Sequence, residues 1–246
     1  MSYDDFSRYY DLLTDNVEYK KRADYFCRLL SMCGIKEGIL LDLGCGTGSM
    51  SFEMADRGFD VIGVDNSIGM LSAAQQKMFE NGKHILLLNQ KMQEIDLYGT
   101  VDCAVCVLDG LNHLDSGDDV KKTFEKVSLF MNQGGAFAFD VNTIHKHKNI
   151  LADNAFVFEP EGVFCAWQNN YNPSDNSVEI SLDFFEEEDG VYYRASESFV
   201  EKAYELDVIK SWLEETGFEI VGIYDDMTID NVKPDTERAV FLAKKK

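Results

Sequence analysis

Three glycines at alternate positions, Gly44, Gly46 and Gly48, form the part of the sequence best suited to binding a ligand. Glycine has no Cβ atom, so the backbone here can adopt positive φ angles and approach a bound molecule closely. Residues 49–57 have the pattern of a helix that Gly58 ends. The start of such a helix presents free N–H groups and the positive end of its dipole. The sequence therefore predicts a cofactor site at this bend.

A second candidate for binding chemistry is Asp65, which ends the apolar stretch 59–65. A carboxylate at the tip of a strand can accept hydrogen bonds from both hydroxyls of a ribose. A dinucleotide fingerprint would read Gly-x-Gly-x-x-Gly, whereas here the third glycine comes one position early and Ser49 takes its place. The pattern favours a nucleoside without a pyrophosphate and disfavours a nucleotide-dependent oxidoreductase.

These residues resemble the class I S-adenosylmethionine-dependent methyltransferases. The first family motif, hydrophobic-Asp/Glu-x-Gly-x-Gly-x-Gly, is present from Leu41 to Gly48, and Asp65 matches the acid that closes the second strand. The resemblance runs from about residue 3 to the C-terminus, and it implies S-adenosylmethionine as cofactor. It also implies an α/β fold with a seven-stranded, doubly wound, mostly parallel sheet (Rossmann-like methyltransferase) and an antiparallel β insert as cap.

The resemblance also implies a set of cofactor contacts. Tyr10, in the segment Tyr10-Asp11-Leu12-Leu13, is expected to fold over the methionine end, because aromatic faces attract cations such as a sulfonium. Met70 is expected against adenine, although it could equally be a core residue. The complete set is Tyr10, Asp42, Gly44, Cys45, Gly46, Gly48, Asp65, Asn66, Met70, Lys91, Met92, Leu108 and Asp109.

The aromatic N-terminal segment has a second interpretation. Tyr3, Tyr9 and Tyr19 lie near Tyr10 in the sequence, and all of them could belong to helices packed on the sheet. The adenine site also departs from the family pattern, because Lys91 stands where many relatives carry an acid. An ammonium only donates hydrogen bonds, so we expect adenine to be recognised by backbone groups around Lys91 and Met92, or by an amide oxygen of Gln90 or Gln93.

Alternating strands and helices must position these residues. Strands are predicted at 38–43, 59–65, 84–88, 101–108, 136–141, 218–224 and 238–243, the last two as an antiparallel hairpin at the sheet edge. Helices are predicted at 17–32, 49–57, 67–80, 120–131 and 205–216. Ligands of such sheets lie outside the carboxyl ends of the strands. By family resemblance, the loop 109–114 then lies beside the glycine bend, with Asn112 and His113 facing the substrate.

Methyl transfer from a sulfonium requires in-line approach and exclusion of water, not a covalent intermediate. No nucleophile triad is visible, and none is needed. If the acceptor needs a base, the candidates are His113, Asp109 and a tyrosine of the N-terminal segment. We assign none of them, and His113 could also be a structural residue. Metal binding is not predicted, because His145 and His147 share no helical face and lack nearby partners.

Residues 145–204 differ in pattern, because their apolar residues alternate at period two. We expect an antiparallel β cap here, inserted between residues 1–144 and 205–246, which form the cofactor-binding domain with its N-terminal helical flap. The cap either covers a sheet edge or pairs with another subunit, or it roofs the acceptor pocket, which we favour. Candidate acceptor contacts in it are Trp167, Tyr171, Tyr192, Tyr193 and Arg194.

Composition limits the partners. The formal net charge of -21 repels phosphate backbones and anionic membranes, so neither nucleic acid nor a membrane is expected. Six scattered cysteines and a polar N-terminus favour a cytoplasmic protein. We expect a monomer or homodimer that transfers a methyl group from S-adenosylmethionine to a small-molecule acceptor by in-line displacement. The alternative is a regulatory or assembly protein that binds the cofactor without catalysis.

Overall fold

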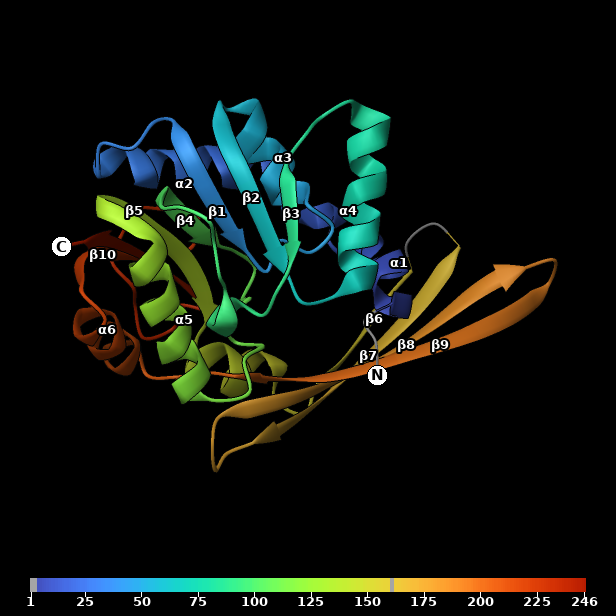
Figure 1. Cartoon of the computed structure of the whole chain (residues 1–246). Coiled ribbons are helices and arrows are strands. Elements are labelled where there is room, and N and C mark those ends of the chain that lie inside the picture. The colour runs from blue at the N-terminus through green and yellow to red at the C-terminus, as the bar shows by residue number, and fades with distance from the viewer. Residues whose placement is uncertain (1–3, 160–161) are drawn as a thin grey trace.

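The computed structural model describes residues 4–159 and 162–246, and a seven-stranded sheet forms its centre (Figure 1). The strands lie in the order β10-β11-β5-β4-β1-β2-β3. β11 runs antiparallel to both of its neighbours, and the other pairs are parallel. Their bounds are β1 Gly38–Leu43, β2 Phe59–Asp65, β3 Leu86–Asn89, β4 Val101–Cys106, β5 Met131–Asn142, β10 Phe218–Asp225 and β11 Arg238–Lys245. The expected fold and its edge hairpin are confirmed.

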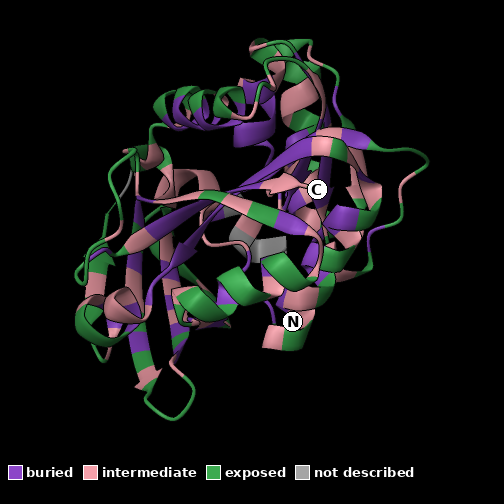
Figure 2. Ribbon diagram, turned by 90° about the vertical axis from the view of Figure 1, so that its left-hand side faces the viewer, coloured by how far each residue is buried: buried purple, intermediate pink, exposed green. Residues whose placement is uncertain are grey.

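Helices cover both faces of this sheet, as the continuously apolar central strands require. One buried cluster joins the sheet to α2 and α3, and another joins it to α5 and α6. Figure 2 shows the buried strands between the layers of helices. The helices are α1 Asp4–Leu13, α2 Tyr19–Met32, α3 Ser49–Asp56, α4 Ile68–Asn81, α5 Gly117–Phe130 and α6 Leu206–Glu215, with short 3₁₀ turns at Asp15–Val17 and Met92–Glu94.

A separate four-stranded antiparallel sheet is inserted between β5 and α6, after a π-helix at Lys146–Leu151. It consists of β6 Ala155–Phe158, β7 Val163–Asn172, β8 Ser177–Glu188 and β9 Val191–Lys202, in that order. We call this sheet the cap. It packs against α1 and α4 through a third apolar cluster that includes Tyr9, Met70 and Phe184. In Figure 1 the β8–β9 hairpin crosses beneath the body and extends beyond it.

Several elements differ from their sequence predictions. β5 begins at Met131, where a helix was expected to end, instead of at residue 136. β6 was not among the predicted segments, because its sequence AFVF is too short to show a period. β4 ends at Cys106 rather than at residue 108, because Leu108 and Asp109 turn into left-handed conformations with φ of 56° and 57°. In the described residues, no helix combines the length and the apolar character that crossing a membrane requires.

Candidate functional site

The glycine bend follows β1 and faces a cavity of about 450 Å³ at the carboxyl edge of the sheet. Gly44 and Gly46 line this cavity with φ angles of 66° and 54°. A Cβ atom on Gly46 would lie 3.9 Å from Cε1 of Tyr10, and one on Gly44 would lie 3.3 Å from Cε of Met92. Side chains at either position would therefore project into the space that a ligand needs.

Most of the positions expected to contact a cofactor line this one cavity, and His113 lines it as well. Its volume falls in the range of small-molecule sites, which is about 300–1,000 Å³. The expected residues that line it are Tyr10, Gly44, Gly46, Asp65, Asn66, Met70, Lys91, Met92 and Leu108. The other expected positions, Asp42, Cys45, Gly48 and Asp109, are not among the residues that line it.

Asp65 ends β2 with its carboxylate turned toward the glycine bend. Its Oδ2 accepts a hydrogen bond from the backbone N–H of Gly46 at 2.9 Å, and its Oδ1 accepts one from Ser67 at 2.8 Å. Burial raises the pKa of Asp65, although these N–H groups oppose the shift. A carboxylate offers about four acceptor sites. Each oxygen thus retains a lone pair, which is what the two hydroxyls of a ribose require.

Asp42 supports the bend from beneath. Its side chain is fully buried, and its Oδ2 accepts a hydrogen bond from Oγ of Ser51 at 2.5 Å, which joins β1 to the first turn of α3. Its Oδ1 has no hydrogen-bond partner among the described residues. Asp42 also lines a second space of about 10 Å³, about the size of one water molecule. Burial raises the pKa of Asp42 to about 7.

This raised pKa predicts a pH-dependent stability. The folded state holds the proton more tightly than the unfolded state, so stability falls as pH rises from the ordinary value near 3.8 to about 7. At about 1.4 kcal/mol per pKa unit, a pKa of about 7 implies a loss of roughly 2–3 kcal/mol between pH 5 and pH 8. Asp42→Asn should remove it, as urea unfolding at the two pH values will show. The exposed Asp60→Asn controls for lost charge, and equal pH dependence of both variants would contradict the prediction.

Cys45 and Gly48 contribute to the packing around the glycine bend. The Cys45 side chain packs on β2, since a Cβ atom on Gly63 would lie 3.0 Å from its Sγ. Gly48 precedes α3 with φ of 81°, and a Cβ atom there would come within 2.9 Å of the Phe52 ring. Its lack of a side chain thus serves the packing of α3 on the bend.

One of the groups near Lys91 that were expected to bind adenine, the side-chain amide of Gln90, is already hydrogen-bonded within the protein. The side-chain amide of Gln90 closes its own loop: Oε1 accepts from the N–H of Asp96 at 2.9 Å, and Nε2 donates to the Asp96 carbonyl at 3.2 Å. Lys91, Met92 and Gln93 line the cavity. The backbone here and the amide of Gln93 therefore remain the candidates for binding adenine.

The left-handed turn at Leu108 and Asp109 is held by Asp140 at the end of β5. The buried carboxylate of Asp140 accepts hydrogen bonds from both backbone N–H groups, at 3.0 and 2.8 Å. Arg238 at the start of β11 donates to the carboxylates of both Asp140 and Asp109. Burial alone would raise the pKa of Asp109, but Arg238 and His113 hold it well below its usual range. The turn thus ends in an ionised carboxylate.

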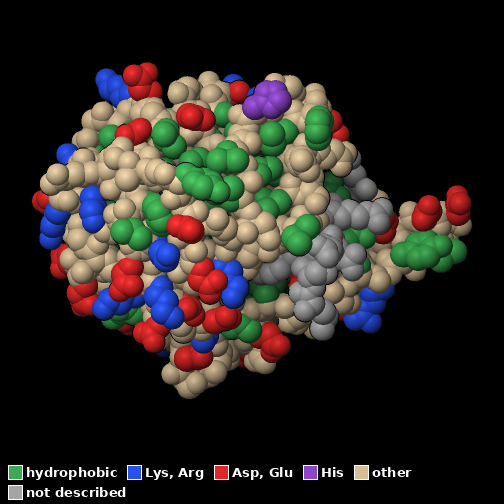
Figure 3. All heavy atoms as spheres, in the orientation of Figure 1, with side chains coloured by type: hydrophobic (Ala, Val, Ile, Leu, Met, Phe, Trp, Pro, Cys, Tyr) green, Lys and Arg blue, Asp and Glu red, His purple; other side chains and the backbone are tan. Residues whose placement is uncertain are grey.

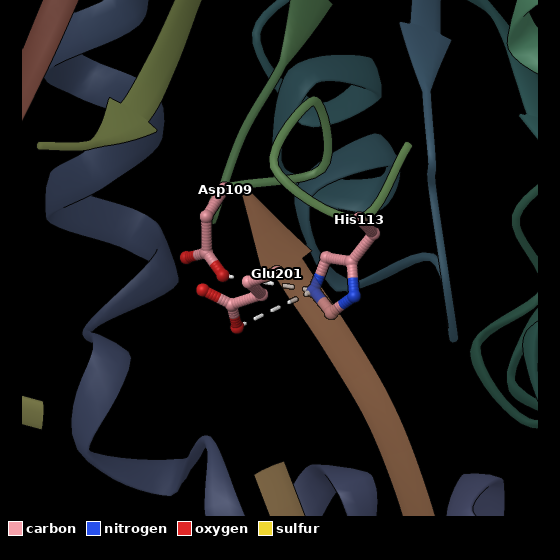
Figure 4. Close-up of side chains that lie close together, drawn as sticks. All are labelled: Asp109, His113 and Glu201. Atoms are coloured by element: carbon pink, nitrogen blue, oxygen red, sulfur yellow. Dashed lines mark ion pairs between the residues drawn. The ribbon is translucent and has the colours of Figure 1, made fainter. Parts of the chain in front are cut away.

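Figure 4 shows that two carboxylates from different parts of the chain face the same nitrogen of His113. Its Nε2 is 3.6 Å from Oδ2 of Asp109 and 3.8 Å from Oε1 of Glu201 on β9. Burial alone would lower the pKa of His113, but the two carboxylates outweigh this effect and raise it. Glu201 was not predicted from the sequence, because a single acid in a β-strand has no distinguishing local pattern.

Comparisons with known proteins agree with this geometry. The model of the family described as "Methyltransferase domain" matches residues 40–135. A protein of Geobacillus sp. (strain WCH70), named "Putative methyltransferase", is 33% identical, and the alignment covers all of both chains. The structure of a S-adenosylmethionine-dependent methyltransferase from Clostridium acetobutylicum ATCC 824 is 30% identical with a TM-score of 0.89, and covers 99% of this chain and 98% of that one. The chain belongs to the S-adenosylmethionine-dependent methyltransferases. A glycine/sarcosine N-methyltransferase of Parasynechococcus marenigrum (strain WH8102) is 25% identical over 94% of this chain and 80% of that one.

S-adenosylmethionine is therefore the cofactor, and the cavity of this methyltransferase suits it. The bend at Gly44 and Gly46 leaves space beside the backbone, and Asp65 offers two acceptor oxygens to the ribose.

Asp11 holds helix α1, the N-terminal flap of the methyltransferase, beside the cavity. Its Oδ1 accepts hydrogen bonds from Oγ1 of Thr47 at 2.7 Å and from Nζ of Lys77 at 2.8 Å. These contacts join α1 to the glycine bend and to α4, and they hold the neighbouring Tyr10 over Gly46. Tyr3, the other tyrosine expected at this end, lies outside the described residues.

Loss of the hydrogen bonds of Asp11 should weaken cofactor binding. Asp11→Ala removes two hydrogen bonds that hold Tyr10 in place, so the dissociation constant of S-adenosylmethionine is expected to rise roughly 3- to 10-fold. Isothermal titration measures the change. Asp15→Ala, an exposed acid outside α1, is the matched control. An equal affinity of the two variants would show that α1 does not cover the cofactor.

The cap residues that approach the cavity differ from the aromatic residues named from the sequence. Phe199 and Val200 of β9 line it. Tyr192 and Tyr193 are more than half exposed, and Arg194 pairs with Asp183. These three lie near the tip of the β8–β9 hairpin, which projects from the body in Figure 3 with hydrophobic and acidic side chains. Trp167 and Tyr171 are also absent from the cavity lining.

Asn112 connects the cap to the body instead of facing the cavity. Its Nδ2 donates to the carbonyl oxygens of Asn142 and Lys202 at 3.1 and 2.8 Å, and its Oδ1 accepts from the N–H of Asn142 at 2.9 Å. The end of β9 is thus fixed to the end of β5. This junction places Glu201 beside His113.

Proposed function

We propose that this methyltransferase transfers the methyl group of S-adenosylmethionine to the nitrogen of a small-molecule amine by direct in-line displacement. The observation that carries the proposal is the position of His113 in the wall of the cofactor cavity, with its Nε2 facing the carboxylates of Asp109 and Glu201. Carboxylates attract an ammonium, and an imidazole can accept its proton. The likeness to a protein named as a glycine/sarcosine N-methyltransferase supports a nitrogen acceptor.

The charge around Glu201 favours a cationic acceptor. Asp109 is neutralised by Arg238. Among the residues that the structure describes, Glu201 forms ion pairs only with His113 and His147. Histidine is not a permanent cation, so Glu201 lacks the fixed positive partner that Arg238 gives Asp109. A small amine that enters as its ammonium supplies a positive charge.

The chain contributes position and exclusion of water to the reaction. When bound, S-adenosylmethionine supplies a methyl group already activated by a sulfonium sulfur. Gly44, Gly46 and Asp65 orient the nucleoside, while Tyr10 and Phe199 cover the cavity from the flap and from the cap. Orientation and desolvation of this kind can supply much of the rate enhancement. The contribution of Phe199 supports the cap as the roof of the acceptor pocket.

Direct assay tests the proposal. The purified protein is incubated with S-adenosylmethionine and a panel of small amines that includes glycine and sarcosine, and methylated products are detected by mass spectrometry. Each amine is paired with its hydroxyl analogue as control. We expect methylation of amines and not of the analogues. Methylation of oxygen alone would overturn the nitrogen assignment, and cofactor binding without any transfer would favour a regulatory role.

A further inference from the structure

The buried His147 shows how protons are arranged behind His113. Nδ1 of His147 lies 2.9 Å from the carbonyl oxygen of Asn176. A carbonyl oxygen only accepts hydrogen bonds, so Nδ1 carries the proton. The lone pair on Nε2 then faces Oε2 of Glu201 at 3.4 Å. Nε2 is buried without a hydrogen-bond partner among the described residues, so the His147 ring packs against Oε2 without donating to it.

Asn142 fixes which oxygen of Glu201 takes part. Nζ of Lys146 can only donate, and it lies 2.9 Å from Oδ1 of Asn142. The amide of Asn142 therefore turns its Nδ2 toward Glu201, where it donates to Oε2 at 2.9 Å. Oε2 is occupied by Asn142 and His147, which leaves Oε1 for His113.

The oxygens that face His113 determine its tautomer. Its Nε2 faces Oδ2 of Asp109 and Oε1 of Glu201. Both oxygens are acceptors, so the neutral ring carries its proton on Nε2. Nδ1 is buried without a hydrogen-bond partner among the described residues, and in Figure 4 it lies on the side of the ring away from the carboxylates. The free lone pair of neutral His113 is therefore on Nδ1.

We infer that Nδ1 of His113 accepts the proton of the acceptor amine, and that Glu201, held by His147 and Asn142, is the positioning residue that selects this tautomer. The inference rests on the proposed function, because the proton comes from an ammonium. That ammonium gives one proton to Nδ1, and the electron pair of the N–H bond becomes the nitrogen lone pair. The lone pair forms the carbon–nitrogen bond, the pair of the broken carbon–sulfur bond stays on sulfur, and His113 later releases its proton to solvent.

The charged groups around His113 determine its pH dependence. Asp109 and Glu201 face Nε2, the Phe199 ring lies 5.0 Å away, and the charge of Asp65 acts in the same direction as the two carboxylates. Their net effect raises the pKa of His113 against its burial. A neutral ring is required to accept a proton. Activity toward the amine should therefore increase as pH rises through this raised pKa.

Substitutions can distinguish a catalytic role of His113 from a structural one. His113→Ala should lower kcat for the amine by roughly 10²- to 10⁴-fold while the affinity for S-adenosylmethionine changes little. Glu201→Gln removes a negative charge, so the acidic limb of the kcat/KM profile should move to lower pH. Glu197→Gln, a buried acid on the same strand, should leave the limb unchanged.

Nuclear magnetic resonance tests the tautomers without an acceptor. The chain has four histidines, so the ring ¹⁵N signals of the full-length protein can be assigned by substitution. We expect the Nε2–H tautomer for His113 and a protonated Nδ1 for His147. An Nδ1–H tautomer of His113, or full amine methylation by His113→Ala, would overturn the inference while the proposed function stands. If wild-type protein methylates no amine, the proposed function fails, and with it the role of His113 as base.

Discussion

Replacement of Arg238 by methionine is expected to lower the free energy of unfolding by about 3–5 kcal/mol, the usual result of breaking a buried ion pair. The guanidinium contacts the carboxylates of both Asp109 and Asp140, and Asp140 is fully buried. Methionine fills a similar volume but leaves both carboxylates without this cation. The left-handed turn at Leu108 and Asp109 also depends on Asp140, so the cofactor cavity should lose part of its wall.

Urea unfolding followed by circular dichroism measures this loss. The matched control is Arg194→Met, because Arg194 also pairs with an aspartate, Asp183, but lies exposed on the cap. Exposed pairs contribute little, so this control should unfold almost as wild type does. Arg238→Lys should fall between the two, since an ammonium cannot reproduce the fork of donors. Equal stability of the Arg238 and Arg194 variants would contradict the prediction.

Asp65→Ala is expected to weaken binding of S-adenosylmethionine by about 1.5–3 kcal/mol, which is the range for hydrogen bonds to a charged group and corresponds to roughly 10- to 150-fold. The substitution removes both ribose acceptors. It also frees the N–H groups of Gly46 and Ser67 that the carboxylate now accepts from. The bend should therefore lose its alignment together with its ligand contact.

Isothermal titration of the folded variant gives the dissociation constant. Asp60→Ala, on the same strand but exposed, controls for the loss of one acid from β2. Asp65→Asn should give an intermediate affinity, because its amide oxygen can still accept one hydrogen bond. If Asp65→Ala binds as tightly as the Asp60 variant, Asp65 does not hold the ribose.

The cavity wall around the glycine bend could be predicted because its signals are local. Gly44 and Gly46 need positive φ angles, which only a few residue types tolerate, and the following helix is read from its own sequence. Asp65 ends an apolar stretch whose length sets its place at the carboxyl edge. These features follow from neighbouring residues. They lie in the cavity wall where the family resemblance places them.

The acceptor half could not be predicted, because it depends on contacts between distant parts of the chain. Asn112 donates to Lys202 across 90 positions, and this junction helps to bring Glu201 to His113. Asp140 ends β4 early by accepting from two N–H groups 32 and 31 positions away. No local pattern marks an acid or an amide for such a contact. Tyr192 and Tyr193 were expected to contact the acceptor because they are aromatic. They lie near the tip of the β8–β9 hairpin and are exposed there.

The contact between α1 and the cap has a consequence for the order in which the protein assembles. Tyr9 stacks on Phe184 of β8 at a ring distance of 4.5 Å, and its hydroxyl donates to Glu186 at 3.0 Å. Helix α1 thus has two sets of contacts that become available at different times. Its contacts with Thr47 and Lys77 need only residues up to α4, whereas those of Tyr9 need the much later strand β8. The N-terminal flap is therefore fully supported only after the cap has been synthesised.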